Sequence, residues 1–305
     1  MMNFVLRTIA LTKKYKEHTV IDHMNLNIRR GDIYGILAKG GAGKTTLLRM
    51  MMGLIAPTSG EVELFGETSH RAKRRLFERM GCMSETFGFA DNLTAAENLE
   101  IHRRLMGVPG KQCIADSLKM VGLSDIQNVR CYGLTMSMRQ RLGIARALMH
   151  EPELLLLDEP WSGLDSQEIK EISRLLSRIS QTRQMTIVIS SRLINGIQPI
   201  ANRIGILQGA TLAAELDHET LLQKSRRYMK FRVSDEKQAA VLLEQDMGIH
   251  DYKISEPGLV LVYEQLERSS AITRLLIEHD VDVIEASFNQ GLIDDYMIEL
   301  MRENV

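Results

Sequence analysis

A glycine-rich segment joins an apolar run at residues 33–37 to a second apolar run at residues 47–52. The segment reads Ala38-Lys39-Gly40-Gly41-Ala42-Gly43-Lys44-Thr45-Thr46. We expect the first run to be a strand and the second a helix, so that the backbone N–H groups between them and the helix N-terminus surround a phosphate. Lys44 would then neutralise the β- and γ-phosphate oxygens, and Thr45 would offer its hydroxyl to Mg²⁺. With Gly43, Lys44 and Thr45 in frame, the pattern indicates a nucleotide site rather than a tight packing turn.

Two adjacent carboxylates follow another apolar run, Leu154–Leu157. Asp158 is suited to hold the hydration shell of Mg²⁺, and Glu159 to take a proton from an attacking water. An acidic pair at a strand end is, on its own, more often a helix cap. Together with the glycine-rich segment, the pair predicts phosphoryl transfer from a nucleotide to water.

The elements that must position these residues alternate between short apolar runs and longer helical patterns up to about Leu216. This alternation is typical of a largely parallel sheet covered by helices. The predicted strands are Ile33–Leu37, Leu154–Leu157, Thr186–Ile189 and Arg203–Leu207. The first three are apolar on both faces, as buried parallel strands are, and should form the centre of the sheet.

A different pattern begins beyond residue 224. A helical stretch over residues 218–224 and a basic cluster at 225–227 separate two predicted domains, 1–224 and 225–305. The second should be a small α+β unit with the order of a split βαβ sandwich. Its predicted elements are strand 228–233, helix 236–245, strands near 252 and over 259–263, helix 269–279, strand 281–286 and a final helix.

The composition narrows the function classes. Of 305 residues, 38 are Lys or Arg and 39 are Asp or Glu, so no charge excess favours nucleic acid or anionic lipid as a partner. The three cysteines are too widely spaced for the usual zinc patterns, and we expect reduced thiols. No apolar run approaches the roughly 18 to 20 residues that span a bilayer, so we expect a chain that neither crosses a membrane nor is secreted.

These motifs make the chain resemble the ATP-binding cassette (ABC) family over residues 4 to about 215, in particular multidrug exporters of the bacitracin-resistance and lantibiotic-immunity type. The resemblance implies a P-loop NTPase cassette: a mostly parallel sheet with an antiparallel subdomain and a helical subdomain. The small α+β C-terminal domain matches an appendage common in this group. The resemblance also implies ATP and Mg²⁺ as ligands.

Further site residues are implied by position within the family's motifs. Tyr15 resembles the aromatic residue on which adenine stacks, or it is a core residue, and Val20 would line the same face. Glu85 stands where a glutamine usually touches Mg²⁺ and the membrane partner. Thr135 and Ser137 lie in the signature segment 134–141, which reaches the γ-phosphate of a partner cassette. The ATP-binding residues predicted in all are Tyr15, Val20, Lys39, Gly40, Gly41, Ala42, Gly43, Lys44, Thr45, Thr46, Glu85, Thr135, Ser137 and Asp165, the last in the segment 162–165 that couples the two sites.

Four positions depart from the family's pattern. Ala38 replaces a glycine, and an alanine forced to positive φ would cost roughly 1 to 2 kcal/mol. Ser137 replaces the second glycine of the signature, where a side chain would hold a dimer apart, and Thr135 is bulkier than the usual serine. Arg192 occupies the position of the switch histidine, where it would either clamp the phosphate or misplace the water. We therefore expect slow hydrolysis or pairing with a second, more regular cassette, and a gain in rate when Arg192→His and Ser137→Gly are combined.

The resulting interpretation is the ATPase subunit of an exporter. Catalysis would rest on Glu159, Lys44 and Arg192, and metal binding on Thr45, Glu85 and Asp158. The partners would be a membrane-spanning permease and a second cassette in a head-to-tail dimer. Residues 87–97 would contact the permease, unless they are an ordinary surface loop. Nucleic acid is not expected as a partner. The protein would lie in the cytoplasm on the inner face of the membrane. The alternative is a poorly hydrolysing, ATP-gated binding module or a degenerate partner in a heterodimer.

Overall fold

The structure is a computed structural model that describes residues 4–68, 75–76, 78–217, 219–220 and 227–289. The chain forms two compact units, residues 1–218 and 219–305. The boundary predicted between residues 224 and 225 lies outside the described residues, as does most of the helical stretch predicted over 218–224. Each unit is described on its own below.

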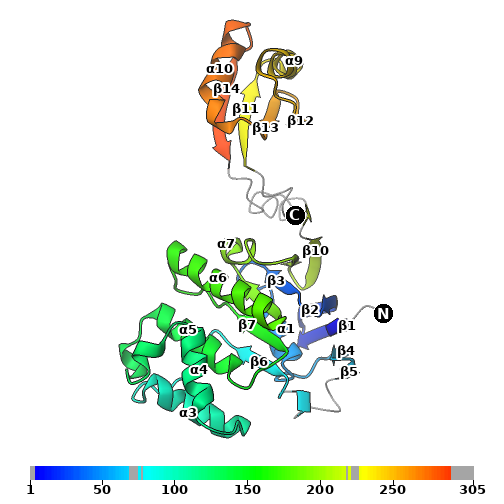
Figure 1. Ribbon diagram of the computed structural model, residues 1–305. Helices are drawn as coiled ribbons and strands as arrows, with labels where there is room; N and C mark the ends of the chain where they lie inside the picture. Colours follow the sequence, from blue (N-terminus) through cyan, green and yellow to red (C-terminus); the bar gives the residue numbers. More distant parts are fainter. Residues whose placement is uncertain (1–3, 69–74, 77, 218, 221–226, 290–305) are drawn as a thin grey trace. The chain divides into compact units, whose positions relative to one another are not determined.

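A six-stranded sheet forms the centre of the first unit, in the order β10-β9-β3-β8-β7-β6 (Figure 1). Strands β9, β3, β8, β7 and β6 run parallel, and β10 pairs antiparallel with β9. Every residue of β3, β7 and β8 is buried, as predicted for the centre of the sheet. The strands are β3 (Ile33–Leu37), β6 (Met80–Met83), β7 (Leu154–Asp158), β8 (Thr186–Ser191), β9 (Arg203–Gln208) and β10 (Thr211–Asp217).

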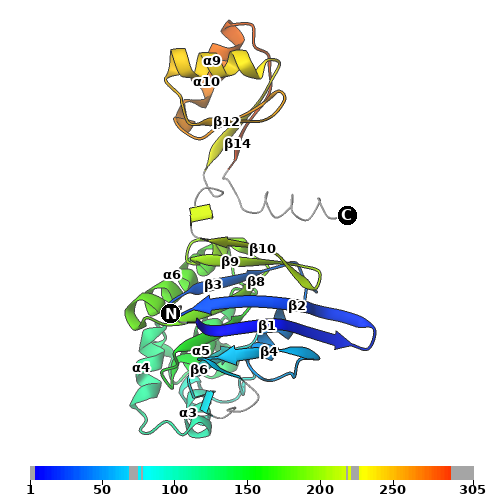
Figure 2. The same ribbon diagram turned by 90° about the vertical axis from the view of Figure 1, so that its right-hand side faces the viewer.

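A second, antiparallel sheet has the order β2-β1-β4-β5. Its two long strands, β1 (Phe4–Tyr15) and β2 (His18–Arg29), form a hairpin that Figure 2 shows extending along one side of the unit. Strands β4 (Ser59–Leu64) and β5 (Glu67–Thr68) complete it. Apolar residues of β1, β2 and the helix after β3 share one core with the central sheet, which fixes β2 against that helix.

The helices of the first unit divide into those beside the central sheet and a group of three, α3, α4 and α5, that pack on one another (Figure 1). Side-chain caps begin α3, α5 and α6, at Thr94, Thr135 and Asp165. The helices are α1 (Lys44–Met51), α3 (Ala95–Met106), α4 (Gln112–Met120), α5 (Met136–Leu148), α6 (Ser166–Arg183) and α7 (Ile194–Ile197), with short 3-10 turns at Ser124–Ile126 and Cys131–Gly133.

Over its described residues 227–289, the second unit is an antiparallel sheet in the order β12-β13-β11-β14 with two helices packed on it. Its element order, βαββαβ, is the split βαβ arrangement that the sequence predicted. Phe231, Leu243, Val262 and Leu276 lie in its core. The predicted final helix falls in residues 290–305, outside the described residues. The elements are β11 (Tyr228–Val233), α9 (Glu236–Met247), β12 (Tyr252–Glu256), β13 (Leu259–Val262), a 3-10 turn (Leu266–Arg268), α10 (Ser269–Glu278) and β14 (Val283–Asn289).

Within the described part of the chain, none of the helices combines the length and apolar character that a membrane crossing requires.

Candidate nucleotide site

The glycine-rich segment is the turn between β3 and α1, and two of its glycines have backbone conformations that other residues rarely adopt. Gly41 has φ +83° and Gly43 has φ +81°. A Cβ on Gly43 would lie 2.7 Å from the carbonyl oxygen of Val20 and 2.8 Å from Ile21 Cδ1, whereas one on Gly41 would meet nothing within 4 Å. Gly43 therefore allows β2 to approach the first turn of α1.

The strain expected at Ala38 is not present. Ala38 is not among the residues with positive φ, and it is buried at the end of β3. Its N–H donates to the carbonyl of Ser191 at 3.3 Å, and its own carbonyl accepts from Lys44 Nζ at 2.8 Å. Residue 38 thus contributes its backbone N–H and carbonyl to the turn, and the methyl group of alanine adds no conformational cost.

The Lys44 ammonium lies inside the turn. Its side chain is 6% exposed, and Nζ also donates to the carbonyl of Lys39 at 3.2 Å and lies 3.4 Å from Glu159 Oε1. Burial lowers the pKa of Lys44, and the negative charge of Glu159 counters part of that effect. A cation held by two carbonyls and one carboxylate is placed to exchange the carboxylate for phosphate oxygens.

The two predicted carboxylates end β7 and are both buried. Ser190, from the neighbouring strand β8, donates its hydroxyl to Asp158 Oδ1 at 2.5 Å, and its carbonyl accepts from the Glu159 N–H at 3.1 Å. Glu159 has φ +50°, a conformation that costs a non-glycine residue about 1 kcal/mol or more and is found preferentially at functional sites. Hydrogen bonds to β8 hold the turn in this conformation.

Arg192 follows β8 and contacts carboxylates on two sides. Its Nε lies 3.3 Å from Glu159 Oε1, and its backbone N–H donates to Glu159 Oε2 at 3.1 Å. Its Nη2 lies 3.5 Å from Oε1 of Glu85, in the segment after β6. Because β6, β7 and β8 are parallel neighbours, their carboxyl ends bring Glu85, Glu159 and Arg192 to one edge of the sheet.

These groups line one hollow of about 250 Å³. Thr45 lines it as well, and Asp158 ends the adjacent strand. Mg²⁺ in nucleotide enzymes uses one or two carboxylates together with substrate phosphates, so a hydroxyl and a buried carboxylate beside a phosphate-sized turn fit this ion. Of the predicted residues, the hollow brings together Val20, Gly40, Gly41, Ala42, Gly43, Lys44, Thr45, Thr46, Glu85, Glu159 and Arg192.

Five predicted ATP-binding residues do not line this hollow. Two of them are Lys39, which is exposed, and Tyr15, which is the last residue of β1. The Tyr15 ring is not core: it is 47% exposed, with Lys13 Nζ 5.0 Å from its centroid. It is therefore free to stack on a planar group.

The other three lie at the N-termini of α5 and α6. Thr135 caps α5 by accepting from the Met138 N–H at 3.2 Å, and Asp165 caps α6. Ser137, in the first turn of α5, is only 9% exposed, which leaves little of its side chain to obstruct a partner. Residues at two helix N-termini are suited to contact an anion on another molecule rather than within this hollow.

Ser190 contacts the candidate site, although the sequence analysis gave it no role. The signal that could have identified it is a run of hydroxyl residues ending an otherwise apolar strand, Thr186–Ile189. In the register of the sheet, Ser190 stands beside Asp158, so its hydroxyl is the nearest available donor.

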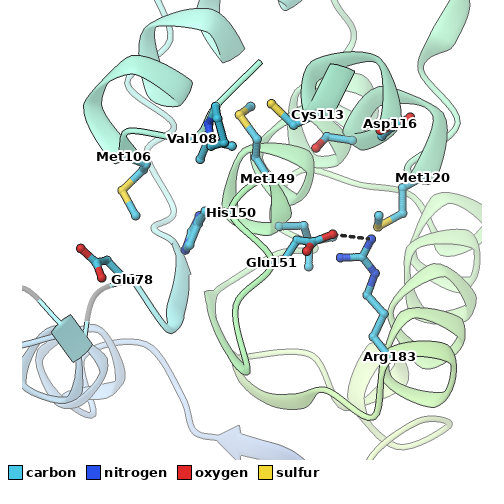
Figure 3. A pocket seen from close by; sticks show the side chains of 13 residues that line it. Glu78, Met106, Val108, Cys113, Asp116, Met120, Met149, His150, Glu151 and Arg183 are labelled. Carbon is cyan, nitrogen blue, oxygen red and sulfur yellow. Dashed lines mark ion pairs between the residues drawn. The ribbon is translucent and has the colours of Figure 1, made fainter. Parts of the chain in front are cut away.

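A second hollow of about 430 Å³ lies apart from these groups, against α4 and the end of α5 (Figure 3). Methionines 106, 120 and 149 and Cys113 line it, together with Glu78, Asp116 and the Glu151–Arg183 ion pair at 3.9 Å. It contains none of the predicted site residues.

Comparison with known proteins agrees with this geometry. The family model described as "ABC transporter" matches residues 21–162. The chain is 40% identical to the bacitracin transport ATP-binding protein BcrA of Bacillus licheniformis over 98% of both chains. It is 31% identical to the lantibiotic transport ATP-binding protein SrtF of Streptococcus pyogenes, over 70% of this chain and 92% of that one.

Among solved structures, a dimeric ATP-binding cassette in a post-hydrolysis state with ADP and Pi bound is similar with a TM-score of 0.65 and 26% identity. This match covers 70% of the chain and 98% of the cassette. The expected cassette fold is thereby confirmed. The chain belongs to the ABC transporter ATP-binding proteins, the ATPase cassettes in which ATP hydrolysis is coupled to transport.

Proposed function

We propose that this chain binds ATP and Mg²⁺ in the hollow described above and powers export of a peptide antibiotic or another amphipathic compound through a separate membrane subunit. The observation that carries the proposal is the pair of Lys44 Nζ and Glu159 Oε1, 3.4 Å apart and both buried. Burying a cation and an anion is costly, and it is typical of a site whose charges await a charged ligand. The cargo class comes from the relatives, whose names refer to bacitracin and lantibiotic transport.

In this proposal the backbone N–H groups of the β3–α1 turn and Lys44 bind the phosphates, and Tyr15 stacks on the base. Thr45 and Asp158 hold Mg²⁺ together with Glu85, which lines the same hollow. The ion would supply charge neutralisation on the phosphate oxygens. Ser190 keeps Asp158 oriented by its hydroxyl.

Glu159 is the proposed general base. Phosphate oxygens that take its place at Lys44 leave the carboxylate free to accept a proton from the attacking water. Its buried position excludes bulk solvent, and its two hydrogen bonds to β8 and Arg192 fix its direction. These are the requirements for a base that acts at one face of a bound nucleotide.

We further propose that the signature and the α6 cap, Thr135, Ser137 and Asp165, complete the site of a second cassette in a head-to-tail dimer. The similar cassette solved as a dimer supports this arrangement. Neither helix N-terminus reaches the hollow of its own chain, which is what a composite site requires.

For the permease contact we propose residues 87–97, as the sequence suggested. The segment is held firmly: Arg146 of α5 donates to the Phe87 carbonyl at 2.6 Å and lies over the Phe89 ring. Asn98 binds the carbonyls of Ala90 and Thr94. A loop tied to α5 on one side and continuous with Glu85 on the other can transmit a change at the nucleotide. The protein would then lie in the cytoplasm, on the inner face of the membrane.

A second candidate function is favoured by one observation. The Nε and the backbone N–H of Arg192 both contact the carboxylate of Glu159. The proposed base therefore already has a partner, at the position where the family has a histidine. Such a cassette would turn over slowly and act as an ATP-gated module, or as the weaker member of a heterodimer.

The deciding experiment is purification of a tagged Glu159→Gln chain from detergent-solubilised native membranes with ATP, because this form should bind nucleotide and stall. We expect a multi-span membrane protein to co-purify, and less of it with a Lys44→Ala control that cannot hold the phosphates. A second cassette in the same complex would identify a heterodimer. Absence of any membrane protein would contradict the transporter assignment for this chain and favour the ATP-gated module.

A further inference from the structure

Four charged groups lie in a row at the carboxyl edge of the central sheet, in an arrangement that the family role of each does not explain. The guanidinium of Arg192 lies between the carboxylates of Glu159, at 3.3 Å, and Glu85, at 3.5 Å. Lys44 Nζ lies 3.4 Å from the same Oε1 atom of Glu159. The order along this row is therefore lysine, glutamate, arginine, glutamate, with alternating charge.

The row depends on arginine at position 192. A guanidinium has five N–H donors in a planar fork and keeps its charge at every pH a protein meets, so it can serve two carboxylates at once. A neutral imidazole has one N–H, and a lysine is a point charge on a flexible stem. Neither could join Glu85 to Glu159 in this way.

The row also defines what a triphosphate must displace. Phosphate oxygens compete with Glu159 for Lys44, and they compete with both carboxylates for Arg192. Glu85 and Arg192 are about half exposed, at 46% and 50% of their side chains, so their pairing is weak enough to exchange. Glu159, at 7%, has little access to water that would replace a lost partner.

We infer that Arg192 is a positioning residue that latches Glu85 to Glu159, and that a triphosphate binds by opening this latch. Arg192 thereby links the segment that we assign to the permease contact with the general base. A cassette held in this way binds ATP less tightly than its phosphate-binding turn alone would allow. Releasing Arg192 from Glu85 should tighten binding.

The test is a double-mutant cycle on the full-length chain. Binding of a fluorescent ATP analogue is measured in EDTA, so that any role of Glu85 toward Mg²⁺ does not contribute. Glu85→Gln should tighten binding about two- to fivefold, the range of an exposed ion pair. In an Arg192→Gln or Arg192→Lys background the same change should alter affinity by less than about 1.5-fold, because the latch is already absent.

Glu256→Gln is the matched control, because it removes an ion pair of similar length and exposure, Arg232–Glu256 at 3.3 Å, in the second unit. It should leave the affinity unchanged. An equal gain from Glu85→Gln in all backgrounds would mean simple charge removal and would overturn the latch, as would no gain in the parent chain.

The inference rests on the proposed nucleotide site, and one variant separates the two. A Lys44→Ala chain that binds the analogue as tightly as the parent would overturn the site itself, and the latch with it. A Lys44→Ala chain that loses binding, with no coupling between positions 85 and 192, would overturn the latch alone.

Discussion

Alanine substitutions at three glycines of the β3–α1 turn should have graded effects, because the same added methyl group meets three different situations. At Gly40 the backbone φ is not positive and a Cβ would meet nothing within 4 Å, so we expect a change in unfolding free energy within about 0.5 kcal/mol. At Gly41 the space is also open, but φ is +83°, and the left-handed conformation alone should cost about 1 to 2 kcal/mol.

At Gly43 both penalties apply. The φ of +81° costs the same amount, and contacts of 2.7 Å with Val20 O and 2.8 Å with Ile21 Cδ1 force β2 or α1 to move. Overpacking of this kind adds about 1 to 3 kcal/mol, for a total of about 2 to 5 kcal/mol. The carbonyl of Val20 belongs to a paired strand, so it cannot relax as the end of a flexible side chain would.

Urea unfolding of the full chain, followed by tryptophan fluorescence, measures this series. The chain has one tryptophan, Trp161, which is 1% exposed in the first unit, so the signal reports on the unit that contains the turn. The expected order of stability is Gly40→Ala, then Gly41→Ala, then Gly43→Ala. Equal losses for the Gly40 and Gly41 variants would refute the argument from φ, and equal losses for the Gly41 and Gly43 variants would refute the argument from contact with β2.

Three further predictions concern the carboxylates and a half-buried histidine. Glu159→Gln should lower the ATPase rate about 10²- to 10⁴-fold while nucleotide binding persists. A decrease of less than tenfold in a steady-state assay would argue against Glu159 as the base. Ser190→Ala removes the hydroxyl donor of buried Asp158 and should cost about 1.5 to 3 kcal/mol in urea unfolding, since the acceptor is charged; a loss under 0.5 kcal/mol would show that water replaces the hydroxyl. Burial lowers the pKa of His102 to about 4, below the 6.5 of an unfolded chain, so stability should be full above pH 6.5 and decrease as the pH falls toward 4. Allowing for partial exposure, this loss of unfolding free energy should be about 1 to 2 kcal/mol, and His102→Gln should reduce the pH dependence by that amount. If the variant and the parent chain lose the same unfolding free energy between pH 6.5 and 4, His102 is not the cause.

Much of the nucleotide site was predictable because its information is local. The turn that holds Lys44 and the strand that ends at Asp158 are each encoded within ten consecutive residues, and an apolar run before a polar cluster is sufficient to identify both. The three fully buried strands were predicted for the same reason. Residues 4–29 were harder to assign, since register shifts along β1 and β2 break the alternation that identifies a strand. Positive φ at Ala10 and His23 accompanies these irregularities.

Contacts between distant segments could not be predicted in this way. Glu85 and Arg192 are 107 positions apart, and only the strand order β8-β7-β6 brings them to the same edge. The backbone conformation of Ala38 is equally non-local, because it depends on the hydrogen bond that its N–H donates to β8. A glycine in the family motif suggested positive φ, but the position needs only a small residue whose carbonyl can reach Lys44.

The departures from the family pattern therefore differ in weight, and the structure orders them. Ala38 contributes backbone groups that any residue has, so its methyl group changes nothing that Lys44 needs. Ser137 is largely buried, which limits its effect on a partner cassette. Arg192 alone alters the charges around the proposed general base, because it adds a permanent cation 3.3 Å from Glu159 and binds a second carboxylate as well. If hydrolysis by this cassette is slow, the cause should lie within its own nucleotide site rather than at the surface it presents to a partner, and in a heterodimer the defect would stay with the site that contains Arg192.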